Sequence, residues 1–202
     1  AAQHGNRLMP LSQPVSRTHI HRREIICQGY LRDDGLWDIE GHLTDTKGYA
    51  FNNSFRGRIE PGTPIHEMWL RLTVDDQLSI KAVEAVTDYG PHAECPAITV
   101  NFQRLVGLRI GPGWRKAVKE KVGGVEGCTH LVEMLPAMAT AAVQTIFPYR
   151  ESRKKENPWS DTMGSGEKKR PPLLDSCHVY DSRGPYVKER WPEWYEGDDK
   201  TA

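Results

Sequence analysis

The chain has 202 residues, which suits one domain with extensions, or one domain and a small appendage. Its 27 basic and 27 acidic residues cancel, so no overall field favours nucleic acid or an anionic membrane. No apolar stretch approaches the ~20 residues that cross a bilayer, and the polar lead over residues 1–21 lacks a signal-peptide core. None of the four cysteines forms a C-x-x-C pair, so we expect reduced thiols in a cytoplasmic protein.

The first half of the chain has the pattern of an antiparallel sheet. Apolar and polar residues alternate from Leu36 to Leu43, as they do in a half-buried strand. Asp33, Asp34 and Gly35 before this segment form a hairpin signal. We therefore expect successive strands joined by short turns, at residues 25–30, 36–44, 49–59, 65–74 and 78–87.

The second half changes to helical spacing, with helices expected at residues 98–106, 114–122 and 128–147. Pro136 should kink the last helix or split it in two. The fold class is then α+β: a curved antiparallel sheet in the N-terminal half, packed by two or three helices, with a C-terminal extension. In this scheme residues 22–148 form the core domain, 149–170 an exposed linker, and 171–202 a segment that packs back on the core.

The polar face of the strand at residues 36–44 is the first candidate for chemistry. Asp38, Glu40 and His42 lie on it at two-residue spacing, so two carboxylates and an imidazole point the same way. Such a set is either a solvated strand face or one wall of a general acid/base site.

The start of the long helix is the second candidate. His130 and Glu133 are three residues apart and share a helical face, while Cys128 precedes them near the positive end of the helix dipole. This set can transfer protons or ligate a metal. The structural alternative is a cap at Thr129 with Cys128 as a small buried filler. His66, on the apolar side of its strand, is interpreted as a satisfied core histidine.

A metal site would draw on cysteine and histidine. The candidate ligands are Cys128, His130, Cys177 and His178, which suit zinc or iron. Because Cys177 and His178 are adjacent, only one of them can point into any one site on an extended strand. The spacings match no standard zinc module, and no nucleotide-binding motif is present. The cofactor is therefore none or one divalent metal.

Four segments carry a resemblance to a known family: CQGYLRDDGLWDIEGHLTDTK, PIHEMWLRLTVDD, LVGLRIGPGWRKAVKEKVGGVEGCTHLVEML and LLDSCHVY. The chain resembles the bacterial domain-of-unknown-function 2889 family over roughly residues 22–195. The resemblance implies a small cytoplasmic bacterial protein, associated with catabolic gene neighbourhoods for aromatic or acyl compounds. It implies no mechanism.

The leading functional hypothesis is a small-molecule catabolic enzyme, a lyase that works by elimination, decarboxylation or deformylation on an aromatic or carboxylated substrate. The strand face and the helix start would meet in one pocket, with Glu40 or Glu133 as base and His42 or His130 as acid. A bound metal could replace this protonic mechanism. The proposed substrate-binding residues are Trp37, Trp69, Trp114 and Arg71.

Two other classes stay open: a metal-binding or iron–sulfur-scaffold-like protein, and a non-catalytic accessory subunit that binds an enzyme through residues 186–195. The expected partners are a small-molecule substrate and a homo-oligomer, without nucleic acid or membrane.

Overall fold

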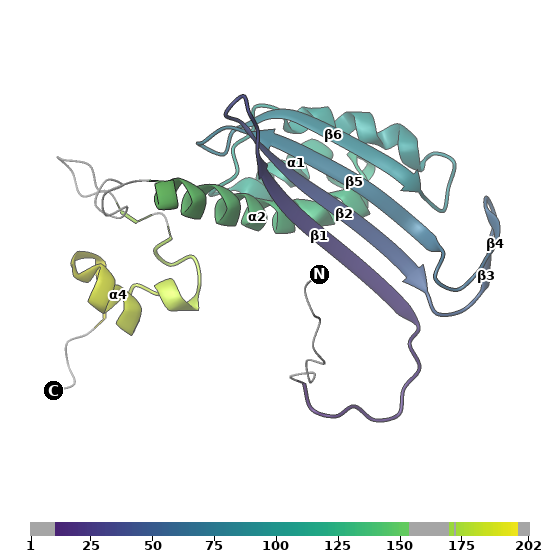
Figure 1. Ribbon diagram of the computed structural model, residues 1–202, viewed down its shortest axis with the longest axis horizontal. Helices are drawn as coiled ribbons and strands as arrows, with labels where there is room; N and C mark the ends of the chain where they lie inside the picture. Colours follow the sequence, from purple (N-terminus) through teal and green to yellow (C-terminus); the bar gives the residue numbers. More distant parts are fainter. Residues whose placement is uncertain (1–10, 154–169, 172, 198–202) are drawn as a thin grey trace. The chain divides into compact units, whose positions relative to one another are not determined.

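The computed structural model describes residues 11–153, 170, 171 and 173–197, and it divides into two compact units, Ala1–Tyr149 and Arg150–Ala202. Every strand among these described residues lies in the first unit. Four of them form an antiparallel sheet in the order β1-β2-β5-β6, which confirms the expected sheet. The strands are β1 (His21–Leu31), β2 (Trp37–Lys47), β5 (Pro64–Val74) and β6 (Ile80–Tyr89). Figure 1 shows their curvature.

The single strand expected at residues 49–59 is instead a small hairpin, β3 (Phe51–Asn53) and β4 (Gly57–Ile59). The Asn53 side chain explains the break, because its Oδ1 accepts the backbone N–H groups of Phe55 (3.0 Å) and Arg56 (2.8 Å). Gly57 then adopts a positive φ of 72°, which turns the chain back. A local side-chain hydrogen bond thus overrides the strand pattern.

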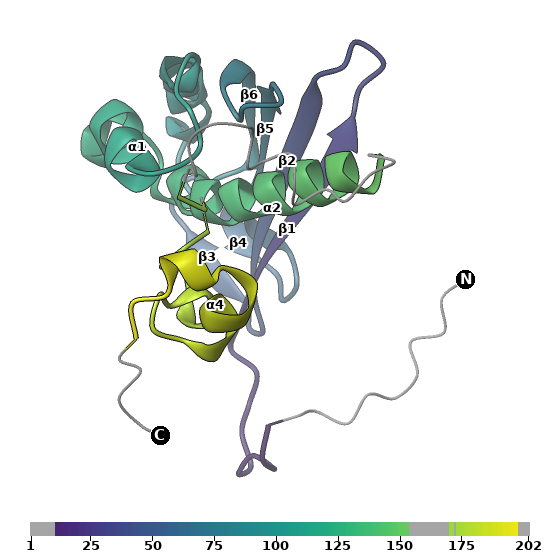
Figure 2. The ribbon, with the colours of Figure 1, turned by 90° about the vertical axis from the view of Figure 1, so that its left-hand side faces the viewer.

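The helices of the first unit cover one face of the sheet (Figures 1 and 2). They are η1 (Cys95–Leu105), α1 (Trp114–Val122), η2 (Gly124–Glu126) and α2 (Thr129–Arg153). The first is a 3-10 helix, with a proline in its first turn. Helix α2 is continuous, so the expectation that Pro136 could split it was wrong, and residues 149–153 are helical rather than linker.

Helix α2 is the central helix of the first unit. By length and composition alone, Thr129–Arg150 could cross a membrane, so the expectation that no apolar stretch approaches that length was wrong. Its fully buried side chains nevertheless join the core against the sheet, as those of a core helix in a soluble protein do. They are Leu131, Met134, Leu135, Met138, Ala142 and Ile146.

The second unit contains η3 (His178–Tyr180), α4 (Pro185–Arg190) and η4 (Pro192–Trp194). Leu174, Val187 and Trp191 form its own small core. That residues 171–202 pack back on the first unit stays a prediction, and most of the expected linker, residues 154–169, lies outside the described residues.

Two glycines show which face of the sheet meets α2. A Cβ added at Gly41 of β2 would lie 2.7 Å from Met138 Sδ, and one added at Gly29 of β1 would overlap the side chain of Thr145. Both methionine and threonine belong to α2, so the helix approaches the sheet closely at both positions. Every second residue of β2 from Trp37 onward therefore faces the helix, and the residues between them face away.

We expect Gly29→Ala to destabilise the protein by about 1–3 kcal/mol, because the new methyl group must displace Thr145 in a packed interface. Gly111→Ala is the control, since no heavy atom lies within 4 Å of its Cβ position. Urea unfolding of both variants would check this. Equal unfolding free energies for the two would contradict the close approach of α2 to β1.

Candidate functional site

Three residues on neighbouring strands form a row on the face of the sheet that meets α2. Arg23 of β1 pairs with Asp45 of β2, and Asp45 pairs in turn with His66 of β5. Asp45 continues the buried alternation of β2, and its side chain is 1 % exposed. The antiparallel register therefore places a guanidinium and an imidazole on either side of a buried carboxylate.

The carboxylate of Asp45 is held by direct hydrogen bonds. Arg23 donates from Nε to Oδ1 and from Nη2 to Oδ2, each at 2.8 Å, in a bidentate pair. His66 Nδ1 lies 3.0 Å from Oδ2, and His21 Nε2 lies 3.1 Å from Oδ1. An ionised carboxylate only accepts hydrogen bonds, so each contacting nitrogen presents a hydrogen to it.

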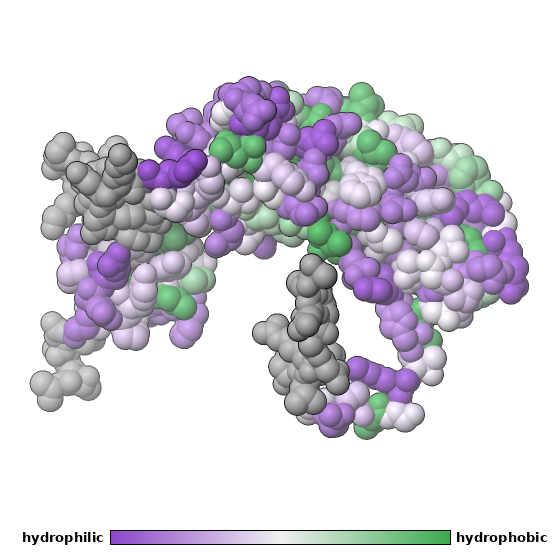
Figure 3. All heavy atoms as spheres, viewed as in Figure 1, coloured by the Kyte–Doolittle hydropathy of each residue, from purple (hydrophilic) through white to green (hydrophobic). Residues whose placement is uncertain are grey.

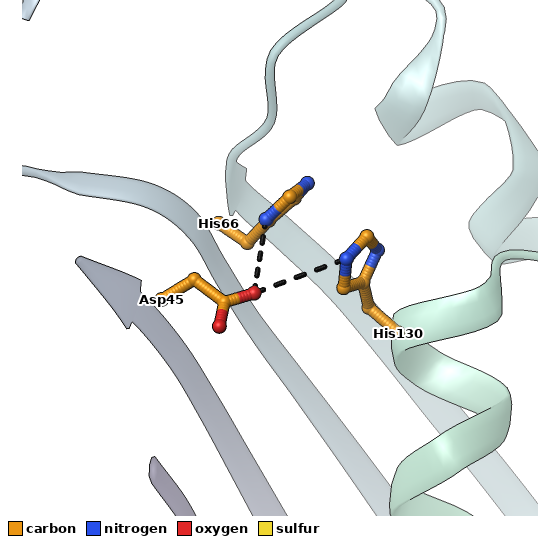
Figure 4. Close-up of side chains that lie close together, drawn as sticks. All are labelled: Asp45, His66 and His130. Atoms are coloured by element: carbon orange, nitrogen blue, oxygen red, sulfur yellow. Dashed lines mark hydrogen bonds and ion pairs between the residues drawn. The ribbon is translucent and has the colours of Figure 1, made fainter. Parts of the chain in front are cut away.

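The first turn of α2 completes the cluster. His130 Nε2 lies 3.8 Å from Asp45 Oδ2, and the rings of His66 and His130 have centroids 3.7 Å apart (Figure 4). Glu133, one turn further, accepts a hydrogen bond of 2.7 Å from Arg23 Nη1. The expected shared face of His130 and Glu133 is confirmed by these two contacts. We refer to Asp45, His66 and His130 as the Asp–His–His cluster.

Local chain chemistry explains why α2 begins here. The preceding segment contains Gly123, Gly124 and Gly127, and the carbonyl of Cys128 accepts the N–H of Val132 at 2.9 Å. Cys128 is thus the N-cap residue, and His130 falls in the first turn. The Sγ atom of Cys128 lies 3.8 Å from His130 Nδ1, whereas the other ring nitrogen of His130, Nε2, is the one near Asp45.

Burial and charge set the protonation states of the cluster. Burial alone would raise the pKa of Asp45, but the hydrogen bonds and charge of Arg23 more than offset it, and the pKa is lowered. Burial, together with the neighbouring His130, lowers the pKa of His66 to about 4. Burial and the charge of Arg23 also lower the pKa of His130. At neutral pH the cluster is an ionised carboxylate beside two neutral imidazoles.

This arrangement has two chemical capacities. Because His66 presents its Nδ1 hydrogen to Asp45, its Nε2 carries the lone pair, and that atom has no hydrogen-bond partner within the described part of the chain. A neutral imidazole oriented by a carboxylate is a general base. The cluster also offers one carboxylate oxygen and two imidazole nitrogens within 4.8 Å of one another, a set that could hold a metal ion.

A family model described as a protein of unknown function, DUF2889, matches residues 21–144, more than half of the chain. The chain belongs to this family. No curated protein and no solved structure matches it. The DUF2889 match contains every residue of the Asp–His–His cluster together with Arg23 and Glu133, and it ends before the second unit.

The two sequence-predicted halves of the site do not meet in this DUF2889 protein. Asp38, Glu40 and His42 lie on the face of β2 that points away from α2, because side chains alternate and Gly41 contacts the helix. The prediction that this strand face and the helix start form one pocket was therefore wrong. On the outer face hydrophilic side chains predominate, with scattered hydrophobic ones (Figure 3).

The outer-face residues are engaged with one another. Asp38 accepts a hydrogen bond of 2.6 Å from Thr73, and His42 Nε2 lies 3.2 Å from Glu67 while its ring stacks on Trp69. Glu40 is paired with Arg71 at 2.8 Å, and Arg71 also binds Glu84 at 2.7 Å. This is the solvated strand face that the sequence left open as the alternative.

The predicted substrate-binding residues are divided between the two faces. Trp37 and Trp114 are core residues, 3 % and 6 % exposed, while Trp69 is on the outer face with Arg71. The guanidinium of Arg71 is neutralised by two glutamates, so it is a poor site for a substrate carboxylate. These four residues therefore do not line one pocket.

The predicted metal ligands are also separated. Cys128 and His130 adjoin each other, but Cys177 and His178 belong to the second unit, which is described by itself. Cys177 is an exposed free cysteine. The only group of three donors among the described residues that could hold a metal contains His130 with Asp45 and His66, not with cysteine.

Sequence reasoning missed Asp45 and Arg23, and interpreted His66 as structural. The sequence does contain a signal that Asp45 is buried, because Asp45 extends the apolar alternation of Trp37 to Leu43 by one more step. His66 stands on the apolar side of its own strand in the same way. A charge on a buried face needs a partner, and two polar residues on adjacent apolar faces indicate that they meet.

The pKa of His66 predicts a pH-dependent stability. Between pH 6.5 and about 4 the unfolded chain binds a proton at this histidine that the folded protein does not, so the free energy of unfolding falls as the pH falls. The loss is at most about 3 kcal/mol over this range. Urea unfolding across pH 4–7 should show this loss. The slope of the unfolding free energy against pH should be smaller in His66→Gln and unchanged in His42→Gln. An unchanged slope in His66→Gln would contradict the assignment.

Proposed function

We propose that the first unit is an enzyme whose reaction centre is the Asp–His–His cluster. The reaction is a lyase step (elimination, decarboxylation or deformylation) on a small aromatic or carboxylated substrate in the cytoplasm, without a nucleotide cofactor. The observation that carries this proposal is the hydrogen bond between Asp45 and His66, which leaves a neutral His66 Nε2 with a free lone pair.

The chemistry follows from these positions. In a deformylation, His66 Nε2 takes the proton of a substrate hydroxyl group, the adjacent C–C bond breaks, and formaldehyde leaves. The carbanion that remains takes a proton back from an imidazolium of the pair, so the step is neutral overall. Two adjacent imidazoles with ring centroids 3.7 Å apart share a single proton more readily than they carry two, which suits a proton that leaves and returns. Asp45 and Arg23 hold the geometry.

The competing explanation is purely structural, because Arg23 bridges Asp45 of the sheet and Glu133 of α2 and so ties the helix to the sheet. This explains the ion pairs, and it also explains why Asp45 is buried. The structural explanation does not require a pair of imidazoles with an unpartnered Nε2. Apolar residues in place of the two histidines would pack better. A reaction centre accounts for the ion pairs around Asp45 and also for the imidazole pair.

A metal centre at the same cluster is the second candidate. Its support is the set of three donor atoms within 4.8 Å, all of types that zinc and iron accept. The bidentate contact of Arg23 opposes it, since a metal must share an oxygen of Asp45 with a cation 2.8 Å away. The donors are imidazole and carboxylate rather than thiolate, so they favour a single ion over an iron–sulfur cluster.

The acid/base proposal predicts that His66→Gln and His130→Gln each lower turnover by about 10²- to 10⁴-fold, as loss of a general acid or base does. Aryl-substituted hydroxy acids and diols would be screened by liquid chromatography–mass spectrometry, with formaldehyde and carbon dioxide assayed as released products. His42→Gln is the matched control, because His42 is a part-buried histidine beside a carboxylate on the opposite face. Equal turnover in the three variants would exclude the cluster as the reaction centre.

Cobalt(II) binding tests the metal candidate. A metal centre predicts one Co²⁺ bound per chain with visible d–d absorption, lost in His66→Gln and His130→Gln and kept in His42→Gln. Isothermal titration and absorbance on chelator-free protein would measure both. Binding that is absent, or that survives in the two cluster variants, would exclude this candidate and leave proton transfer untouched.

A further inference from the structure

A pocket of about 250 Å³ lies between the β3–β4 hairpin and the end of β6. None of the sequence-predicted substrate-binding residues lines it. Its wall includes Phe55 and Arg56 of the hairpin and Asp88, Tyr89 and His92 of the β6 end. The volume is below the roughly 300–1,000 Å³ of pockets for drug-sized ligands, so it suits a single small ring.

Arg56 is held in a defined position within this pocket. Its Nη1 donates to the Pro64 carbonyl at 2.7 Å, and its Cζ lies 4.6 Å from the centroid of the Tyr89 ring. The backbone N–H of Arg56 is bonded to Asn53 Oδ1, which orders the turn. The guanidinium is therefore positioned before any ligand arrives, which lowers the entropy lost on binding.

The charge of Arg56 is also uncompensated. Among the residues that the structure describes, no carboxylate lies within ion-pair distance of Arg56, whereas Arg58 in the same hairpin is paired with Glu60 at 2.7 Å. Asp88, the acidic residue of the wall, accepts a hydrogen bond of 2.8 Å from Trp69. A pre-positioned guanidinium with free N–H donors is the group that binds a carboxylate in bidentate geometry.

The pocket lies at the same end of β5 as the Asp–His–His cluster but on the opposite face of the sheet, because Tyr89 of its wall pairs with Glu67, which contacts His42 on the outer face. Pro64, which holds Arg56, is two residues before His66, and Tyr89 of the wall pairs with Glu67, the residue after His66. A ligand bound by Arg56 would thus lie at the same end of the sheet as His66.

We propose that this pocket binds the carboxylate of a small aromatic acid, with Arg56 on the carboxylate and the exposed Phe55 and Tyr89 rings against the aromatic ring. The site is separate from the Asp–His–His cluster, so this proposal does not rest on the proposed function. Binding itself needs no turnover, so it can be tested when no reaction is known.

Benzoate is the probe, with benzamide as its neutral analogue and acetate as the acid without a ring. Trp69 donates to Asp88 of the wall, so tryptophan fluorescence reports occupancy, and isothermal titration gives the affinity. We expect saturable benzoate binding in the millimolar range or tighter, and at least tenfold weaker binding of both benzamide and acetate. Arg56→Gln should weaken benzoate binding at least tenfold, Arg56→Lys less, and Arg58→Gln not at all.

Equal affinities for benzoate and benzamide, or unchanged benzoate binding in Arg56→Gln, would overturn the proposal, as would no saturation by ~10 mM benzoate. The comparison of probes uses the unaltered protein, so it stands even if Arg56→Gln fails to fold. If His66→Gln binds benzoate normally and has the same turnover as the unaltered protein, the reaction centre is contradicted and the pocket proposal is not. Loss of binding in Arg56→Gln with an active cluster would support both.

Discussion

The buried carboxylate of Asp45 is the constraint on which the first unit depends. A charge in the interior is tolerated only with compensation, and removing the partner of such a pair typically costs about 3–5 kcal/mol. Arg23 supplies two hydrogen bonds to Asp45 and a third to Glu133 of α2. One guanidinium therefore compensates the charge and joins the edge strand to the start of the long helix.

This constraint gives the two faces of the sheet different chemistry. On the outer face, charges such as Glu40 and Arg71 neutralise each other next to water, where such pairs contribute little. On the inner face the same kinds of groups are withdrawn from water, and burial lowers the pKa values of His66 and His130. Neutral imidazoles beside an ionised carboxylate result from burial, not from the residue types alone.

Strand β5 contributes to both functional proposals, on opposite faces of the sheet. Its start carries the carbonyl that holds Arg56, and two residues later it carries His66. Because Tyr89 of the pocket pairs with Glu67 on the outer face, the pocket and the cluster are two separate sites rather than two parts of one site. The DUF2889 match over residues 21–144 contains both sites.

The spacing of apolar residues was enough to predict the antiparallel sheet, from its alternation, and the long helix with the shared face of His130 and Glu133, from its helical period, since these depend on spacing along one segment. The register was not predictable, because which residues face each other across strands depends on contacts between distant segments. The strand pattern alone therefore does not show that Glu40 and His42 face away from the helix, nor that His66 meets Asp45. Sequence by itself determined the elements and their polar faces; only tertiary structure decided that Arg23, Asp45, His66 and His130 meet, because burial and register act on the folded chain.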